Sequence, residues 1–172
     1  VMIEPILTLL LGLIIILAII AANGYFVAQE FSYMAVDRTR LAALAAKGDA
    51  SARRALSVAK RTSFMLSGAQ LGITVTGLLV GYAAEPLVGE SLGEILGITG
   101  IPLETGIAMG TVTTLIAATL IQMVLGELYP KNLAIANPEP LSLWLARSTL
   151  IYMSVFGWLI SFFDKSANLF LK

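Results

Sequence analysis

The sequence contains no cysteine and no histidine. Without thiols and imidazoles, a disulfide framework, thiol catalysis, a zinc-type site and an imidazole general base are all excluded. Any metal ion held by these side chains is held by oxygen, which favours hard cations such as Mg²⁺ or Ca²⁺. The sequence also shows no nucleophile–base pair, no glycine-rich phosphate loop and no redox centre. We therefore expect no enzyme activity and no nucleic-acid partner.

Charged residues are scarce as well. They make up 13% of the 172 residues, whereas hydrophobic residues make up 58%, and an ordinary soluble domain has roughly 25% charged residues. Together with a mean hydropathy of +0.88, this composition indicates a membrane protein. No basic segment precedes the first apolar run, and that run is too long for a signal peptide. We expect it to be a retained anchor.

Three apolar segments are long enough to span a bilayer, at about 5–36, 62–84 and 105–136. A hydrocarbon core of about 30 Å takes about 20 helical residues. A continuous helix over the first segment is longer than that, which predicts a tilt or a break near Asn23 and Gly24.

The segments between the apolar runs differ sharply in charge. Residues 38–61 carry seven of the eleven Lys and Arg residues, and their pattern predicts two amphipathic helices with a turn at 47–49. Residues 85–104 carry four acids, no base and several helix breakers, which predicts an extracellular loop with at most a short helix. By the positive-inside rule, the N-terminus lies outside and the C-terminus lies in the cytoplasm of a multi-pass inner-membrane protein.

The C-terminal segment leaves two interpretations open. Residues 141–163 are long enough for a fourth span, but that span would carry Arg147 into the bilayer at a cost of roughly 2.5–3.5 kcal/mol. Trp144, Tyr152 and Trp158 are typical of a membrane interface. We favour a belt helix over 139–172 that lies along the inner membrane face.

Glycines are spaced four residues apart in the second apolar segment. Such pairs let helix backbones approach closely, within a protomer or across a dimer, although glycine is common in membrane helices and chance explains the spacing equally well. The two pairs are Gly68 with Gly72, and Gly77 with Gly81.

A carboxylate, Glu127, ends the uncharged run 105–126. Ionisable groups at such positions are functional candidates because their burial is costly. Pro130, a predicted helix kink, has no N–H to donate to the Gly126 carbonyl four residues earlier. Two oxygen ligands suited to a cation are therefore predicted side by side. The alternative is that Glu127 only marks the helix end and pairs with Lys131.

Further oxygen-bearing side chains occur in the other two apolar segments. Glu30 is a second candidate acid, although it could equally cap its helix or pair with Arg38. On a three-span topology these groups and Glu127 lie toward the cytoplasmic half, where a cavity would suit Mg²⁺. The candidates are Asn23, Gln29, Glu30 and Ser32 in the first segment, and Ser67, Gln70, Thr74 and Thr76 in the second.

Three motifs resemble the DUF21 transmembrane domain of the CNNM/CorC family. They are "NGYFVAQEFSYMAVDRTRL" (23–41), "FMLSGAQLGIT" (64–74) and "VLGELYPKNLA" (124–134). The resemblance covers essentially the whole chain, and the combination of S-x-x-Q-x-G with GE-x-x-PK is fairly specific.

The resemblance implies a homodimer with three membrane helices and a belt helix, followed after residue 172 by cytoplasmic CBS-pair domains. It also implies Mg²⁺ transport, usually export coupled to Na⁺ entry. Glu127 matches the acid of the family's motif and Ser67 matches its helix-two serine. Val27 and Ile73 stand where many members have serine and asparagine. Asn23, Thr74 or the backbone carbonyl of Val27 are the substitutes that we consider.

Two functions follow as hypotheses for this all-α membrane module. In the first, it binds Mg²⁺ through Glu127 and Ser67 with neighbouring oxygens, and moves the ion outward by alternating access. In the second, it does not transport, and serves as a membrane anchor and dimer scaffold for cytoplasmic CBS domains. In either case, residues 37–61 are expected to contact anionic lipid headgroups of the bilayer.

Overall fold

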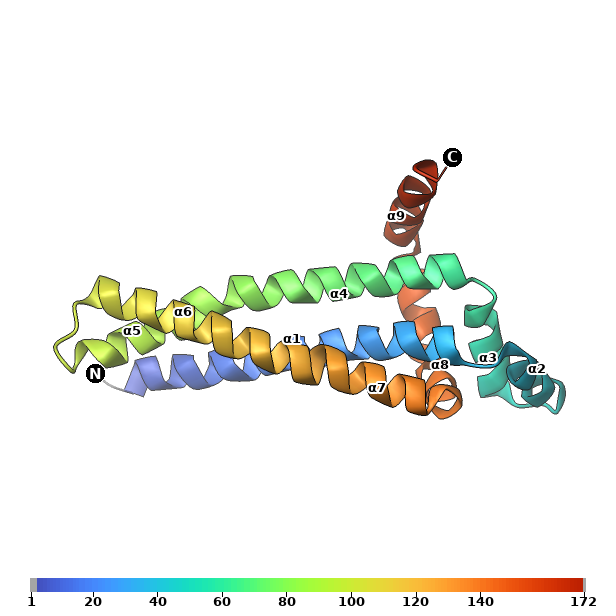
Figure 1. Ribbon diagram of the computed structural model, residues 1–172, viewed down its shortest axis with the longest axis horizontal. Coiled ribbons are helices and arrows are strands. Elements are labelled where there is room, and N and C mark those ends of the chain that lie inside the picture. Colours follow the sequence, from blue (N-terminus) through green and yellow to red (C-terminus); the bar gives the residue numbers. More distant parts are fainter. Residues whose placement is uncertain (1–2, 172) are drawn as a thin grey trace. The chain divides into compact units, whose positions relative to one another are not determined.

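The computed structural model describes residues 3–171, and these contain helices and no strand (Figure 1). By length and composition three helical stretches can cross a membrane, which are Ile3–Ala35, Thr62–Gly97 and Leu103–Ala136. The predicted all-α fold with three membrane helices is therefore confirmed. Lys172, the end of the expected belt helix, lies outside the described residues.

The first stretch is the single helix α1 (Ile3–Ala35) of 33 residues. A helix of that length is about 50 Å long, which exceeds a hydrocarbon core of about 30 Å. The predicted break near Asn23 is not present, because the helix is continuous there. Of the two predicted alternatives, a tilt and a break, the tilt remains.

The chain forms two compact units, and α1 contributes to both. Unit 1 comprises the described residues up to Asn23 together with Thr74–Leu128, and unit 2 comprises Gly24–Ile73 and the described residues from Tyr129 onward. The boundary also divides helix α4 (Thr62–Ala84).

In unit 1, one helix buries small residues and exposes large ones. This helix, α6 (Leu103–Ile121), exposes Met109, Val112 and Ile116, as expected for a lipid-facing surface. The buried positions of α6 recur every fourth residue, at Gly106, Gly110, Thr114 and Ala118. The buried cluster of unit 1 consists of Ile16, Ile20, Val80, Ala83, Ala84, Val88 and Ala118.

A close helical hairpin replaces most of the predicted 85–104 loop. The π-helical turn η1 (Glu85–Gly89) and α5 (Glu90–Gly97) extend α4, and α5 packs alongside α6 in Figure 1. A Cβ atom on Gly93 would lie 2.5 Å from Ile107 Cγ1, and one on Gly110 would lie 2.8 Å from the Gly89 carbonyl oxygen. Both glycines are packing residues, although Gly93 was predicted to be one of the helix breakers of a loop.

Both π-helical segments of the described chain adjoin a proline. Pro86 lies in η1, and η2 (Gln122–Leu128) ends shortly before Pro130 in α7 (Tyr129–Ala136). Because proline has no N–H to donate within an α-helix, the regular bonding pattern cannot continue across it. A locally wider turn is one way for a helix to absorb this loss.

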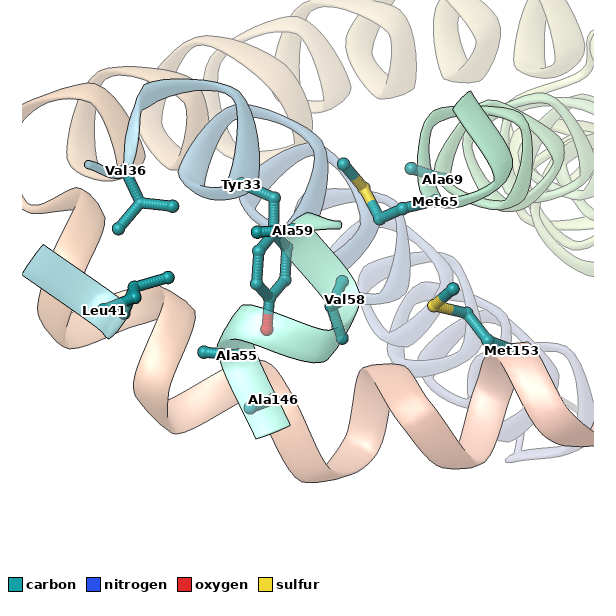
Figure 2. Close-up of a cluster of buried hydrophobic side chains, with 10 residues drawn as sticks. All are labelled: Tyr33, Val36, Leu41, Ala55, Val58, Ala59, Met65, Ala69, Ala146 and Met153. Atoms are coloured by element: carbon teal, nitrogen blue, oxygen red, sulfur yellow. The ribbon is translucent and has the colours of Figure 1, made fainter. Parts of the chain in front are cut away.

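Unit 2 has its own apolar core, which short helices build. Helices α2 (Arg38–Ala46), α3 (Ala50–Ala59) and α8 (Pro138–Val155) pack together in this unit. Figure 2 shows side chains from these helices, α1 and α4 converging on one cluster. Its members are Tyr33, Val36, Leu41, Ala55, Val58, Ala59, Met65, Ala69, Ala146 and Met153.

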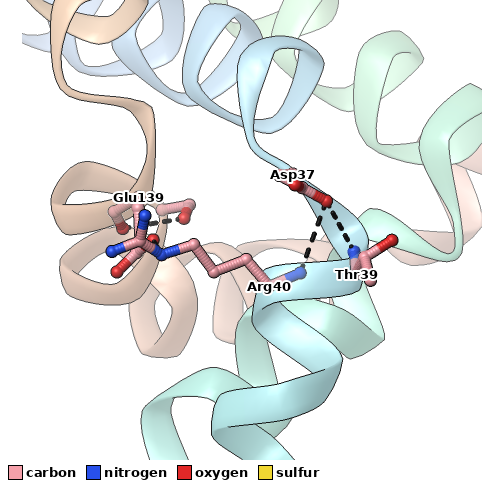
Figure 3. A network of polar contacts seen from close by, with 5 residues as sticks. Asp37, Thr39, Arg40 and Glu139 are labelled. Carbon is pink, nitrogen blue, oxygen red and sulfur yellow. Dashed lines mark hydrogen bonds and ion pairs between the residues drawn. The ribbon is translucent and has the colours of Figure 1, made fainter.

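Aspartates begin the two short helices. The Asp37 carboxylate accepts hydrogen bonds from the backbone N–H of Thr39 (2.8 Å) and Arg40 (3.3 Å), and the Arg40 side chain forms an ion pair with Glu139 of α8 (Figure 3). Asp49 accepts in the same way from Ser51 and Ala52. These caps satisfy N–H groups that have no partner inside the helix.

The segment expected to form a single belt helix consists of two. Helix α8 is followed by α9 (Gly157–Leu169), and the two axes differ by 82°. The helical pattern is interrupted at Phe156, which has φ −99° and ψ 10°. The pair counts as a fourth potential span only if the two bent helices are taken together.

Replacing Asp49 by alanine is expected to lower the free energy of unfolding by about 1 kcal/mol, because the first turn of α3 loses its N-cap. Asp49→Asn keeps a capping oxygen and is expected to change stability little. Thermal unfolding in detergent measures both. Equal stabilities of the alanine and asparagine variants would contradict this prediction.

Candidate ion-binding residues

Asn23 is the centre of a buried polar network in unit 1. Its side chain is fully buried. Its amide Nδ2 donates to the Gly126 carbonyl oxygen at 2.9 Å, and its Oδ1 accepts from the Thr76 hydroxyl at 2.8 Å. Because a carbonyl oxygen can only accept, the amide nitrogen must face Gly126. The network joins α1, α4 and η2 within an apolar environment, where each hydrogen bond is costly to lose.

Gly126 allows this close approach because it has no side chain. A Cβ atom there would lie 3.2 Å from Asn23 Nδ2 and 3.3 Å from Ile20 Cγ2. Pro130 cannot donate to the Gly126 carbonyl, so the Asn23 amide provides the hydrogen bond that the helix lacks. From the sequence, this oxygen is predicted to be a ligand for a cation. One of its two lone pairs is already used, and the second is available to another donor or an ion.

Glu127 follows Gly126 directly, but its side chain is exposed. Among residues 3–171, its carboxylate forms no hydrogen bond or ion pair. Neighbouring residues of a helix point about 100° apart. The carboxylate therefore lies beside the buried network along the backbone and is directed to another face. Thr74, a further predicted ligand of unit 1, is also exposed.

Ser67 is a predicted ligand that lies in unit 2. Its hydroxyl donates to Asp164 Oδ1 at 3.0 Å, and Ser63 donates to the same oxygen at 2.6 Å. Asp164 is not among the ligands predicted from the sequence. The available signal was an aspartate that follows the apolar run 155–163, but its partners are about 100 residues away in sequence and no local pattern identifies them.

The other predicted ligands of unit 2 are Val27 and Glu30. The Val27 side chain is buried, and α1 is unbroken there, so the helical pattern uses its carbonyl. A backbone ligand at Val27 stays a prediction, because a helical carbonyl keeps a second lone pair. Glu30 is half-buried. The Arg38 guanidinium, offered above as its partner, donates to the Thr62 hydroxyl at 2.6 Å.

Lys131 was the predicted alternative partner of Glu127, but in the structure its ammonium group contacts an aromatic ring. The Lys131 ammonium lies 4.8 Å from the centroid of the Phe31 ring, within unit 2. A cation over an aromatic face is attracted by the ring's quadrupole.

The four glycines of α4 fall into two groups. In unit 2, a Cβ atom on Gly68 would lie 3.0 Å from Ile160 Cδ1, and one on Gly72 would lie 2.4 Å from the Phe26 ring, so both pack within the protomer. In unit 1, Gly77 has only Gln122 Nε2 within reach, at 3.6 Å, and Gly81 has nothing within 4 Å.

The predicted ligands supply mostly neutral oxygens and few carboxylates. The described residues contain no group of three or more carboxylates that could hold a metal ion. The predicted ligands are divided between the units: Asn23, Thr74, Gly126 and Glu127 belong to unit 1, and Val27, Glu30 and Ser67 belong to unit 2. Sites with one carboxylate and neutral oxygens suit a cation that keeps much of its water, as Mg²⁺ does.

Comparison with known proteins identifies a family. The profile of the family described as "CNNM: Cyclin M transmembrane N-terminal domain" matches residues 13–172. The chain is 34% identical over 161 residues to an uncharacterized protein of Mycobacterium tuberculosis, which covers 94% of this chain and 46% of the relative. It is 41% identical over 148 residues to a UPF0053 protein of the same species, covering 85% of this chain and 31% of the relative.

A third relative is the UPF0053 protein YugS of Bacillus subtilis, which is 32% identical over 164 residues. That match covers 95% of this chain and 38% of YugS. The chain thus spans less than half the length of these relatives. Since the family profile matches nearly the whole sequence, the chain belongs to the CNNM family and corresponds to its transmembrane domain.

Proposed function

We propose that this domain transports Mg²⁺ across the membrane, with Glu127 as the carboxylate that the ion meets. The observation that carries the proposal is the buried network of Asn23, Thr76 and the Gly126 carbonyl, directly beside Glu127. An apolar unit that maintains a fully buried amide at this point holds one backbone carbonyl in place. Family membership supports a membrane role, and the GE-x-x-PK motif supports Glu127.

The network has a clear physical role in this proposal. Pro130 and the π-helical segment η2 weaken the backbone pattern around Gly126. The hydrogen bond from Asn23 restrains that backbone, and therefore also the start of the Glu127 side chain. In the resemblance-based mechanism, the ion moves outward with Na⁺ as the coupled ion, by alternating access between inward- and outward-facing states.

The flux through proteoliposomes that enclose a Mg²⁺ dye tests the proposal. Glu127→Gln removes the charge, keeps the shape, and is expected to reduce flux at least about tenfold, because a charged ligand stabilises a cation much better than an amide. Glu104→Gln, a matched change at an exposed acid of α6, is expected to keep the wild-type rate. Absence of flux in the wild type, without thermal stabilisation by Mg²⁺, would overturn the proposal.

The second candidate is a membrane anchor and dimer scaffold for cytoplasmic CBS domains. It is favoured by the apolar side chains Val27 and Ile73, which provide no oxygen where the resemblance places ligands. For dimerisation, Gly81 offers an open surface on α4, next to exposed Leu78 and Tyr82. Light scattering in detergent tests this interface: Gly81→Leu is expected to shift a dimer toward the monomer.

A further inference from the structure

Asp164 binds two serine hydroxyls of another helix. Ser63 and Ser67 are one turn apart on the same face of α4, and both donate to Oδ1 of Asp164 on α9, at 2.6 and 3.0 Å. The second carboxylate oxygen, Oδ2, forms no hydrogen bond within residues 3–171. Three oxygens from two helices thus meet at one point of unit 2.

Helix capping does not explain this carboxylate. Asp37 and Asp49 precede their helices and accept backbone N–H groups there. Asp164 lies inside α9, well away from its first turn. Neither free N–H groups nor the positive end of a helix dipole is available to it at that position.

A protein cation does not explain it either. Asp164 is half-buried, and within the described chain no lysine or arginine forms an ion pair with it. The nearby Arg61 guanidinium stacks 4.3 Å from the centroid of the Phe64 ring. Lys165, the next residue of α9, is exposed. Within the described chain the Asp164 carboxylate is therefore held by two hydroxyl donors and no protein cation, so a bound cation would balance its charge.

We propose that Asp164, Ser63 and Ser67 form a binding site for a partly hydrated divalent cation such as Mg²⁺. The carboxylate supplies the charge, and each serine oxygen keeps lone pairs after donating its proton. Mg²⁺ prefers one or two carboxylates and several waters, with metal–oxygen distances of about 2.0–2.1 Å, which places neighbouring oxygens about 2.9 Å apart. The distances of 2.6 and 3.0 Å from the serines to Asp164 are compatible with that spacing.

The relevance of this site to transport rests on the proposed function, because Ser67 is the serine that the resemblance places at the ion site. In this chain, where Val27 and Ile73 provide no oxygen, Asp164 is a carboxylate beside Ser67 that the family motifs did not predict. The cation binding itself rests only on the geometry of unit 2. It can therefore be tested separately from Mg²⁺ flux.

Mn²⁺ is the probe, since it resembles Mg²⁺ in its ligands and its free form gives an electron paramagnetic resonance signal that disappears on binding. Titration of the purified full chain in detergent is expected to show a site that Asp164→Asn weakens at least tenfold, equivalent to about 1.4 kcal/mol. The asparagine still accepts the serine hydrogen bonds. Ser63→Ala combined with Ser67→Ala is expected to weaken binding several-fold and keeps the carboxylate, so it serves if Asp164→Asn does not fold. Asp49→Asn is the matched control and is expected to bind as the wild type does.

Two outcomes would overturn this proposal. The first is Mn²⁺ binding by Asp164→Asn with the affinity and stoichiometry of the wild type. The second is the absence of saturable Mn²⁺ binding by the wild type, with Asp164→Asn lowering thermal stability equally with and without Mn²⁺, which identifies Asp164 only as a contact between α4 and α9. Glu127→Gln separates the two proposals: lost flux with intact Asp164-dependent Mn²⁺ binding supports both, and wild-type flux with intact Asp164-dependent Mn²⁺ binding contradicts only the proposed function of Glu127.

Discussion

Replacing Asn23 by leucine is expected to lower the free energy of unfolding by about 2–4 kcal/mol. The change removes both hydrogen bonds of a fully buried amide. It also removes the side-chain donor of the Gly126 carbonyl, which Pro130 cannot replace because it has no N–H. The two lost hydrogen bonds together contribute about 1–3 kcal/mol, and the carbonyl that loses its side-chain donor adds about 1 kcal/mol. Chemical unfolding in mixed micelles measures the loss.

Two controls show whether the effect comes from the network. Asn132→Leu changes the same residue type at an exposed position of α7 and is expected to stay within about 0.5 kcal/mol of the wild type. Thr76→Val removes only the hydroxyl that donates to Asn23 Oδ1. It is expected to lower the free energy of unfolding by about 1 kcal/mol. If Asn23→Leu were as mild as Asn132→Leu, the network would not be a stabilising feature. If the network restrains Glu127 as proposed, Asn23→Leu also reduces Mg²⁺ flux.

Replacing Gly72 by alanine is expected to destabilise unit 2 by about 1–3 kcal/mol. The new Cβ would lie 2.4–2.5 Å from three atoms of the Phe26 ring, far inside van der Waals contact. Phe26 cannot move away freely, because its ring also packs against Tyr152 at a centroid distance of 5.0 Å. Overpacking of this kind costs more than the gain of up to about 1 kcal/mol from replacing a helical glycine.

A double-mutant cycle with Phe26→Ala tests this explanation. The cost of Gly72→Ala should largely disappear when the ring is absent, which gives a coupling energy of at least about 1 kcal/mol. Gly97→Ala, which meets no atom within 4 Å, serves as the neutral comparison. Additive effects of Gly72→Ala and Phe26→Ala would mean that the ring is not the cause.

The candidate site shows where local patterns stop being informative. That Pro130 cannot donate a hydrogen bond to the Gly126 carbonyl, beside Glu127, could be predicted, because proline acts within one helical turn. The hydrogen bond from Asn23 to the Gly126 carbonyl joins residues that are 103 positions apart in the sequence. Asp164 and Ser67 are separated by 97 positions. Both pairings depend on how helices pack, and a single sequence contains no local signal for them.

The glycines illustrate the same limit. In residues 85–104 glycine suggested a loop, whereas Gly93, together with Gly110 of α6, allows α5 and α6 to approach each other closely. A glycine lowers helix propensity in the same way whether it ends a helix or lies in an interface. Which of the two it does depends on the partner helix.

From composition and local order alone, the amino-acid sequence indicates a membrane protein with three apolar helices. It also limits possible metal ligands to oxygen atoms, because the chain has no cysteine or histidine. The packing of the helices was needed to show which oxygens already accept a hydrogen bond, which acids have no partner among the described residues and which glycines lie in tight contacts. Those properties arise when residues distant in sequence share a buried contact, where an unpaired polar group or an extra methyl group has a large cost.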